Sequence, residues 1–157
     1  MDYTDSRVRA GSSSLFAAIA RSRPALHCFG HIHEGWGAKL VNWREELSEY
    51  PSHFTDIDND QSKIIENLAR ITATSFDDAT ATAEKTKKRE EYLGRGYCTA
   101  KLSGHRSNQT LFVNASIEAL EEGTQQLPWI VDIELRAANG FPLARPTPLS
   151  GLGIAEY

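Results

Sequence analysis

The chain has 157 residues, of which 40% are hydrophobic and 24% are charged, and its formal net charge at pH 7 is −4. This length suits one domain with an ordinary core, and the composition predicts a soluble globular protein. The acidic balance disfavours general nucleic-acid binding, and no apolar run of the sequence approaches the roughly 18 residues that a membrane span requires.

The N-terminal residues MDYTDSRVRAGSSS are polar and lack the apolar segment of a secretory signal. Because Cys28 and Cys98 are the two cysteines, we expect no disulfide framework, a reducing compartment and a cytoplasmic location. Cys28 lies in an apolar run, which predicts a buried side chain. A basic cluster at residues 85–89 leaves a nuclear location open, although two glutamates follow it and favour a solvated helix face.

Residues 12–22 predict a helix, since serines stand at its start as cap candidates and apolar side chains recur along one face. Pro24 ends this helix, and residues 25–29 form a short apolar run that predicts a buried strand. Residues 38–43 have a strand-like composition. The succession of helix, tight turn and buried strand is typical of a layered α/β protein.

Residues 44–109 are rich in charge, Thr, Ser and Ala, and hold few large apolar side chains. Within this segment Ile64, Ile65, Leu68 and Ile71 follow a helical spacing, which predicts a short amphipathic helix over 61–72. Residues 80–93 suit either a frayed helix or a disordered segment. We interpret the whole of 44–109 as a charged, partly disordered insertion.

Strand-like patterns return in the last third of the chain. Residues 110–115 predict a strand. In residues 129–135 one face would carry Trp129, Val131, Ile133 and Leu135 and the other Ile130, Asp132 and Glu134, which predicts a half-exposed strand. Proline and glycine are frequent after Ala137, so residues 137–157 form an irregular C-terminal tail. The domain therefore spans residues 1–136 and is interrupted by the charged segment.

The stretch Phe29–Gly37 reads FGHIHEGWG and places His31 and His33 one residue apart between glycines. Neutral imidazole is a common ligand of Zn, Mn and Fe. In an extended segment such residues project to the same side about 6.5 Å apart, so they can serve neighbouring metal positions. Spacing alone leaves a metal role and an incidental pair open, because a catalytic zinc typically has three protein ligands.

The run RPALHCFGHIHEGWG, residues 23–37, closely resembles the last metal-binding motif of calcineurin-like metallophosphoesterases. Residues 112–115 (FVNA) and 128–133 (PWIVDI) resemble the strands that follow this motif in the family. The resemblance covers residues 1–47 and 110–136. It implies an α/β fold that is the C-terminal portion of a four-layer α/β/β/α sandwich, incomplete at its N-terminus.

The resemblance implies a dinuclear metal centre that hydrolyses phosphate mono- or diesters. The implied substrate is a phosphate ester, and the implied cofactors are divalent ions such as Mn, Fe, Zn or Mg. His31 would ligate one metal and His33 the other, and the Gly30 turn would shape the site. No catalytic residue is assigned.

Three further residues stand near this motif or at the end of a matching strand. Glu34 is a base-like neighbour of the ligands or an exposed loop residue. Trp36 is a wall of the substrate cleft or an ordinary packing aromatic. Asn114 ends its strand near the site or serves as a turn or cap residue. The sequence leaves each of these pairs of alternatives open.

The family's other ligands come from upstream motifs: an Asp-x-His, a Gly-Asp with a bridging Asp, a Gly-Asn-His and a further His. The sequence holds no D-x-H, no G-D and no G-N-H. The chain is therefore expected to begin in the middle of a domain. The alternative function is a catalytically inactive fragment or isoform with at most weak metal binding, because two histidines alone cannot hold two dications against water.

Overall fold

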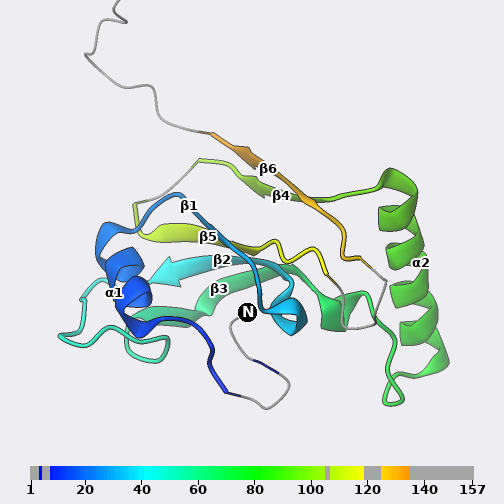
Figure 1. The fold of residues 1–157 in the computed structure, drawn as a ribbon, viewed down its shortest axis with the longest axis horizontal. Helices are drawn as coiled ribbons and strands as arrows, with labels where there is room; N and C mark the ends of the chain where they lie inside the picture. The colour runs from blue at the N-terminus through cyan, green and yellow to red at the C-terminus, as the bar shows by residue number, and fades with distance from the viewer. Residues whose placement is uncertain (1–3, 5–7, 105–106, 119–124, 135–157) are drawn as a thin grey trace, which may run out of the picture.

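The computed structural model of the chain describes residues 4, 8–104, 107–118 and 125–134. Figure 1 shows a mixed α/β arrangement of sheets and helices. In chain order the elements are α1 (Ser13–Ser22), β1 (Leu26–Phe29), the 3₁₀ turn η1 (His33–Gly35), β2 (Gly37–Trp43), β3 (Ile57–Asn67), the 3₁₀ turn η2 (Leu68–Arg70), α2 (Ala79–Arg95), β4 (Cys98–Leu102), β5 (Gln109–Asn114) and β6 (Trp129–Ile133).

The strands form a four-stranded sheet in the order β1-β5-β2-β3 and a two-stranded sheet of β4 and β6. Within the larger sheet β1 runs parallel to β5, whereas β2 is antiparallel to both β5 and β3. The parallel pairing of β1 with β5 puts the C-terminal ends of both strands at the same end of the sheet, with Phe29 opposite Asn114. The motif with His31 and His33 follows directly at that end.

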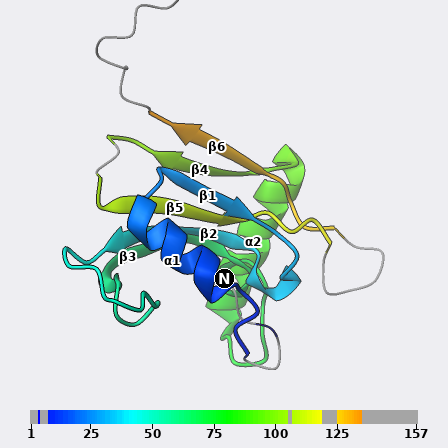
Figure 2. The same ribbon diagram turned by 60° about the vertical axis from the view of Figure 1, so that its left-hand side comes forward.

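The two faces of the larger sheet carry different cores. One face is covered by α1, where Phe16, Ile19 and Ala20 pack against side chains of β2, β3 and β5: Val41, Trp43, Ile57 and Phe112. The opposite face packs on the β4–β6 sheet through Ala38, Leu111, Val113, Ala100 and Leu102. Helix, large sheet and small sheet thus form successive layers, which can be followed in Figure 2.

The early part of the chain and its last strands follow the sequence expectations. Helix α1 starts after Ser12, whose side chain accepts a hydrogen bond from Leu15 N, and the predicted strands appear as β1, β2, β5 and β6. Strand β1 lies at an edge of its sheet and is half-buried, which corrects the expectation of a buried strand. Along β6, Ile130 and Asp132 are exposed while the residues between them are half-buried, as the alternation predicts. The mixed α/β class is therefore confirmed. The tail of residues 137–157 lies outside the described residues.

The amphipathic helix expected over residues 61–72 is wrong, because most of this stretch belongs to strand β3. Ile57 and Ile65 pack into the two cores, whereas Ile64 is exposed. Ile64 and Ile65 lie at a register shift of the β2–β3 pairing, whereas Leu68 and Ile71 lie beyond the strand, so the helical spacing joins residues of different elements. Pairing with β2 therefore prevails over the local pattern.

Residues 80–93 belong to helix α2, so the helical alternative is confirmed. Asp78 caps the start of this helix by accepting from Ala81 N, and Gly96 ends it with a φ of 80°. The segment 44–109 also supplies β3 to the large sheet and β4 to the small one. Within the described residues, no helix is both long and apolar enough to cross a membrane.

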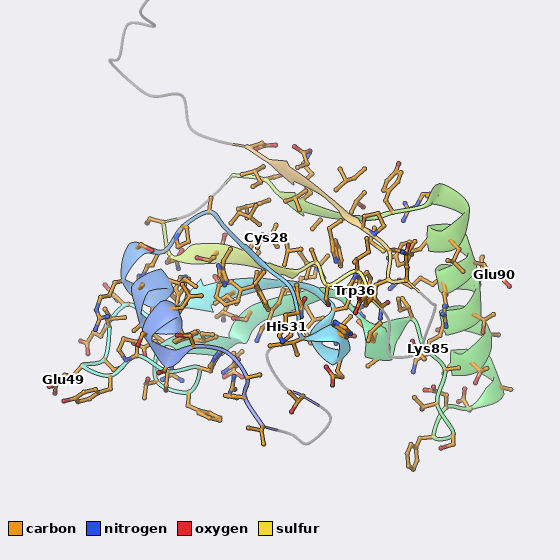
Figure 3. All side chains as sticks on the ribbon, in the orientation of Figure 1. Cys28, His31, Trp36, Glu49, Lys85 and Glu90 are labelled. Atoms are coloured by element: carbon orange, nitrogen blue, oxygen red, sulfur yellow. The ribbon has the colours of Figure 1, made fainter. Side chains whose placement is uncertain are left out.

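Helix α2 stands across one end of the sheets (Figure 1). It attaches to β3 through a buried carboxylate. Glu66 of β3 is 2% exposed and accepts a 2.8 Å hydrogen bond from the Tyr92 hydroxyl. The Lys88 ammonium lies 2.6 Å from the same oxygen. Burial, together with the hydrogen bond to Glu66, raises the pKa of Tyr92 above its ordinary value. Glu90 points away from the sheets (Figure 3), whereas Tyr92 also packs against the hydrophobic cluster of Trp36, Ile71 and Cys98.

Cys28 is exposed, which corrects the expectation of a buried thiol. It lies on β1, an edge strand of the large sheet, and an edge position does not impose burial on both faces. Cys98 is the buried cysteine, and burial raises the pKa of its thiol to about 11.

The loop between β2 and β3 is organised around the buried Asp56. Its carboxylate accepts hydrogen bonds from Ser48 N at 2.8 Å, from Ser52 N at 2.7 Å and from the Ser48 and Thr55 hydroxyls. Burial alone would raise the pKa of Asp56, but these hydrogen bonds outweigh it and lower the pKa to about 2. Asp56 thereby fixes Ser52 and His53, which line the cavity described below.

We expect the Asp56 carboxylate to make folding pH-dependent. A carboxyl with a depressed folded-state pKa stabilises the fold above its unfolded pKa, and this contribution disappears as the pH falls from about 4 to about 2. Asp56→Asn should lower the free energy of unfolding at pH 7 by about 1–2 kcal/mol and flatten the acid limb. Urea denaturation between pH 2 and 7 measures both effects. Asp132→Asn, at an exposed site, should keep the wild-type profile; an unchanged acid limb in Asp56→Asn would contradict the assignment.

Candidate metal-binding site

The loop that carries the two histidines leaves the sheet at the end of β1. Its first turn is constrained, because His31 has a φ of 73°, in the left-handed region that L-residues rarely adopt. His33 then opens the 3₁₀ turn η1. A left-handed non-glycine residue costs on the order of 1–3 kcal/mol, so the surrounding contacts must hold it in place.

Buried polar groups at the end of β5 hold this loop. Asn114 is fully buried, and its Nδ2 donates a 2.7 Å hydrogen bond to the carbonyl oxygen of Ile32, the residue between the histidines. The Ser116 hydroxyl donates to the same carbonyl at 3.2 Å, and the Ser116 N–H donates to Asn114 Oδ1 at 3.1 Å. Asn114 therefore combines a local turn bond to Ser116 with a bond that holds the backbone between His31 and His33.

The glycines of the motif differ in what they do. A Cβ at Gly30 would meet Ser116 N at 3.7 Å, an ordinary contact. Gly37 has a φ of 151°, and a Cβ there would lie 2.5 Å from the Glu66 carbonyl oxygen. Gly37 is thus required where β2 passes between β3 and β5, while space alone does not demand Gly30.

The two imidazoles lie close together, with ring centroids 6.4 Å apart and an interplanar angle of 83°. His31 is exposed, and the side chain of His33 is 31% exposed. The Glu118 carboxylate lies 3.7 Å from His33 Nε2. Sequence reasoning missed Glu118, because it follows β5, far from the motif along the chain.

The imidazoles of His31 and His33 supply part of the ligand set that a metal ion requires. Ring nitrogens bind a transition metal at about 2.0–2.1 Å, so imidazoles at this separation can contact one shared ion or two neighbouring ions. Within the described residues, however, no group of three or more His, Cys, Asp or Glu side chains is placed to hold a metal ion. The pair thus fits two ligands of a metal centre and falls short of the three that a catalytic zinc takes.

The remaining candidates lie around the pair. Glu34 is half-buried within η1. Trp36 is 1% exposed, donates from Nε1 to the Leu127 carbonyl at 3.0 Å, and packs on Trp129 with ring centroids 5.0 Å apart. These contacts make Trp36 a packing aromatic of the core. A cavity of about 380 Å³ does adjoin the pair, and His31 and Gly30 contribute to its lining.

Comparisons with protein-family models, with curated proteins and with solved structures found no match for this chain. The case for a function therefore depends on the motif, the geometry of the loop and the residues around it.

Proposed function

We propose that His31 and His33 are two ligands of a metal-dependent phosphoesterase centre, in a chain that forms the C-terminal part of a four-layer α/β/β/α sandwich. The motif of residues 23–37 supports the family. The layers of α1, the large sheet and the β4–β6 sheet agree with three of the four layers expected.

One observation supports the metal role: the two imidazoles lie 6.4 Å apart on a backbone whose conformation L-residues rarely adopt. His31 adopts a φ of 73°, and Asn114 and Ser116 clamp the Ile32 carbonyl between the histidines. Strained backbone that persists under such clamps is typical of functional sites. An incidental pair of histidines would gain nothing from this arrangement.

A bound divalent ion would polarise the phosphoryl oxygens of a phosphate ester and lower the pKa of a coordinated water. The chain's own residues position the ligands. The Glu118 carboxylate lies 3.7 Å from His33 Nε2, where it would help to orient this imidazole toward a bound ion. His31 faces the cavity, where the ester would lie.

A second candidate is metal binding without turnover. It is favoured by the absence of any three-donor group in the part of the chain that the structure describes. In that case the chain alone binds an ion weakly, and hydrolysis would require ligands from other groups.

Mn²⁺ titration of the ¹⁵N-labelled protein tests the metal role. We expect paramagnetic broadening centred on residues 30–34 that is lost in His31→Gly and in His33→Ala. Glycine relieves the left-handed strain, so His31→Gly should unfold at the same or a higher temperature than the wild type. Its loss of binding therefore cannot come from unfolding. Cys28→Ser removes an exposed thiol of β1 and should bind Mn²⁺ normally.

Broadening that persists in both histidine variants, or that centres on another part of the chain, would overturn the metal role. Hydrolysis of bis(p-nitrophenyl) phosphate then separates the two candidates. Mn²⁺-dependent turnover that His31→Gly abolishes supports an enzyme. Binding without turnover supports the non-catalytic candidate.

A further inference from the structure

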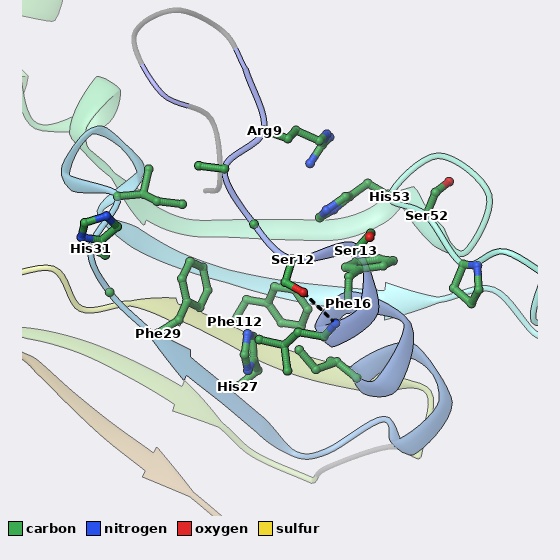
Figure 4. Close-up of a pocket in the computed structure, with 17 residues that line it drawn as sticks. Arg9, Ser12, Ser13, Phe16, His27, Phe29, His31, Ser52, His53 and Phe112 are labelled. Atoms are coloured by element: carbon green, nitrogen blue, oxygen red, sulfur yellow. Dashed lines mark hydrogen bonds between the residues drawn. The ribbon is translucent and has the colours of Figure 1, made fainter.

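A cavity of about 380 Å³ lies between α1, the segment before it, β1 and the loop that carries Ser52 and His53. Figure 4 shows His31 at one end and His53 toward the other, with Phe29, Phe112 and Phe16 between them. Ligand pockets generally measure about 300–1,000 Å³, so this one suits a group of about one ring.

The floor of the cavity is aromatic. Phe29 and Phe112 meet edge to face with ring centroids 6.5 Å apart, and His27 stacks on Phe29 at 5.1 Å. Burial lowers the pKa of His27, which favours its neutral form. Leu15, Phe16 and Ile19 of α1 complete an uncharged wall. Aromatic rings in edge-to-face and stacked arrangements bind a further flat ring well.

The rim has the opposite character. Arg9 supplies a guanidinium, while Ser13, Ser52 and the imidazoles of His31 and His53 supply polar groups. Among the described residues that line the cavity, none is an aspartate or a glutamate. The first turn of α1 adds the partial positive charge of a helix N-terminus at Ser13. The cavity therefore matches a small molecule with an apolar ring and an anionic head.

We propose that this cavity binds the apolar group of an aryl phosphate ester, with its phosphate at the rim beside His31 and Arg9. This substrate class rests on the proposed phosphoesterase function, because His31 belongs both to the metal pair and to the cavity lining. A ring in the cavity would put the phosphate of its ester next to the metal ligands. Sugar phosphates and inorganic phosphate leave the aromatic floor unfilled.

Binding of phenyl phosphate, followed by NMR in the presence of EDTA, tests this proposal without any metal. We expect phenyl phosphate to shift the amides of the lining residues and to bind about tenfold tighter than inorganic phosphate or phenol, a difference of about 1.4 kcal/mol. Ala10→Trp places a large side chain at the exposed rim and should weaken binding about tenfold without removing any core contact.

Two further variants keep the test specific. Arg9→Gln should weaken phenyl phosphate but leave phenol unchanged, because it removes the rim charge alone. Ala79→Trp, at the exposed start of α2, should leave all binding unchanged. Equal affinities for phenyl phosphate and inorganic phosphate, or full binding in Ala10→Trp, would overturn the proposal.

The outcome is separable from that of the metal experiment. Phenyl phosphate binding in EDTA with no Mn²⁺ site at the histidines would support the aryl pocket and refute the phosphoesterase centre. Mn²⁺ binding at His31 and His33 with no preference for phenyl phosphate would refute the substrate class and leave the metal role intact.

Discussion

Replacing Asn114 by Ala should lower the free energy of unfolding by about 2–3 kcal/mol and abolish Mn²⁺ binding at the histidine pair. The side chain is fully buried; its Nδ2 donates a hydrogen bond to the Ile32 carbonyl and its Oδ1 accepts one from the Ser116 N–H. Its removal leaves the buried N–H without this acceptor and frees the backbone between His31 and His33. Urea denaturation and Mn²⁺ broadening measure the two effects.

Two variants distinguish the loss of the hydrogen bonds to the Ile32 carbonyl from the general loss of a polar residue. Ser116→Ala removes the weaker of the two bonds to Ile32 and should cost about 1 kcal/mol while retaining part of the metal binding. Asn108→Ala, at an exposed position, should change neither quantity. If Asn114→Ala kept wild-type stability and Mn²⁺ binding, the clamp would play no part in the site.

Gly37→Ala should lower the free energy of unfolding by about 2–4 kcal/mol. The new Cβ would meet the Glu66 carbonyl oxygen at 2.5 Å, and alanine would have to adopt a φ of 151°. Both effects act on the start of β2, where it pairs with β3 and β5. Because β5 also carries Asn114, the histidine loop should become more mobile, which hydrogen exchange of its amides detects.

Gly94→Ala is the matched control for this substitution. No atom lies within 4 Å of a Cβ at Gly94, which stands inside helix α2. Alanine there should raise the free energy of unfolding by about 0.5–1 kcal/mol, since glycine is a poor helix former. Similar effects of the two substitutions, or a Gly37→Ala variant as stable as the wild type, would contradict the close approach of β2 and β3.

Much of the fold could be predicted from local patterns. Helix α1 has its serine cap and apolar stripe, and the alternation of β6 survives intact in the small sheet. Strand β3 could not be predicted, because its apolar spacing imitates a helix and its pairing with β2 contains register shifts. The docking of α2 was equally hidden, since it depends on Glu66, a residue that local patterns assign to the surface.

Only the part of the site formed by residues close together in the sequence could be predicted. The spacing and motif single out His31 and His33, and the structure puts their rings 6.4 Å apart. The hydrogen bond from Asn114 to Ile32 joins residues 82 positions apart, and Glu118 approaches His33 from the same distant segment. Such contacts arise from the parallel pairing of β1 with β5, which no local pattern specifies.

We propose that His31 and His33 together bind a divalent metal ion. Crystals soaked in Mn²⁺ and measured for anomalous scattering test it most directly. We expect an anomalous peak about 2.0–2.3 Å from a ring nitrogen of His31 or His33 in wild-type crystals, and no such peak in His31→Gly crystals. A difference map with no peak at the pair, or with a peak that persists in His31→Gly, would contradict it.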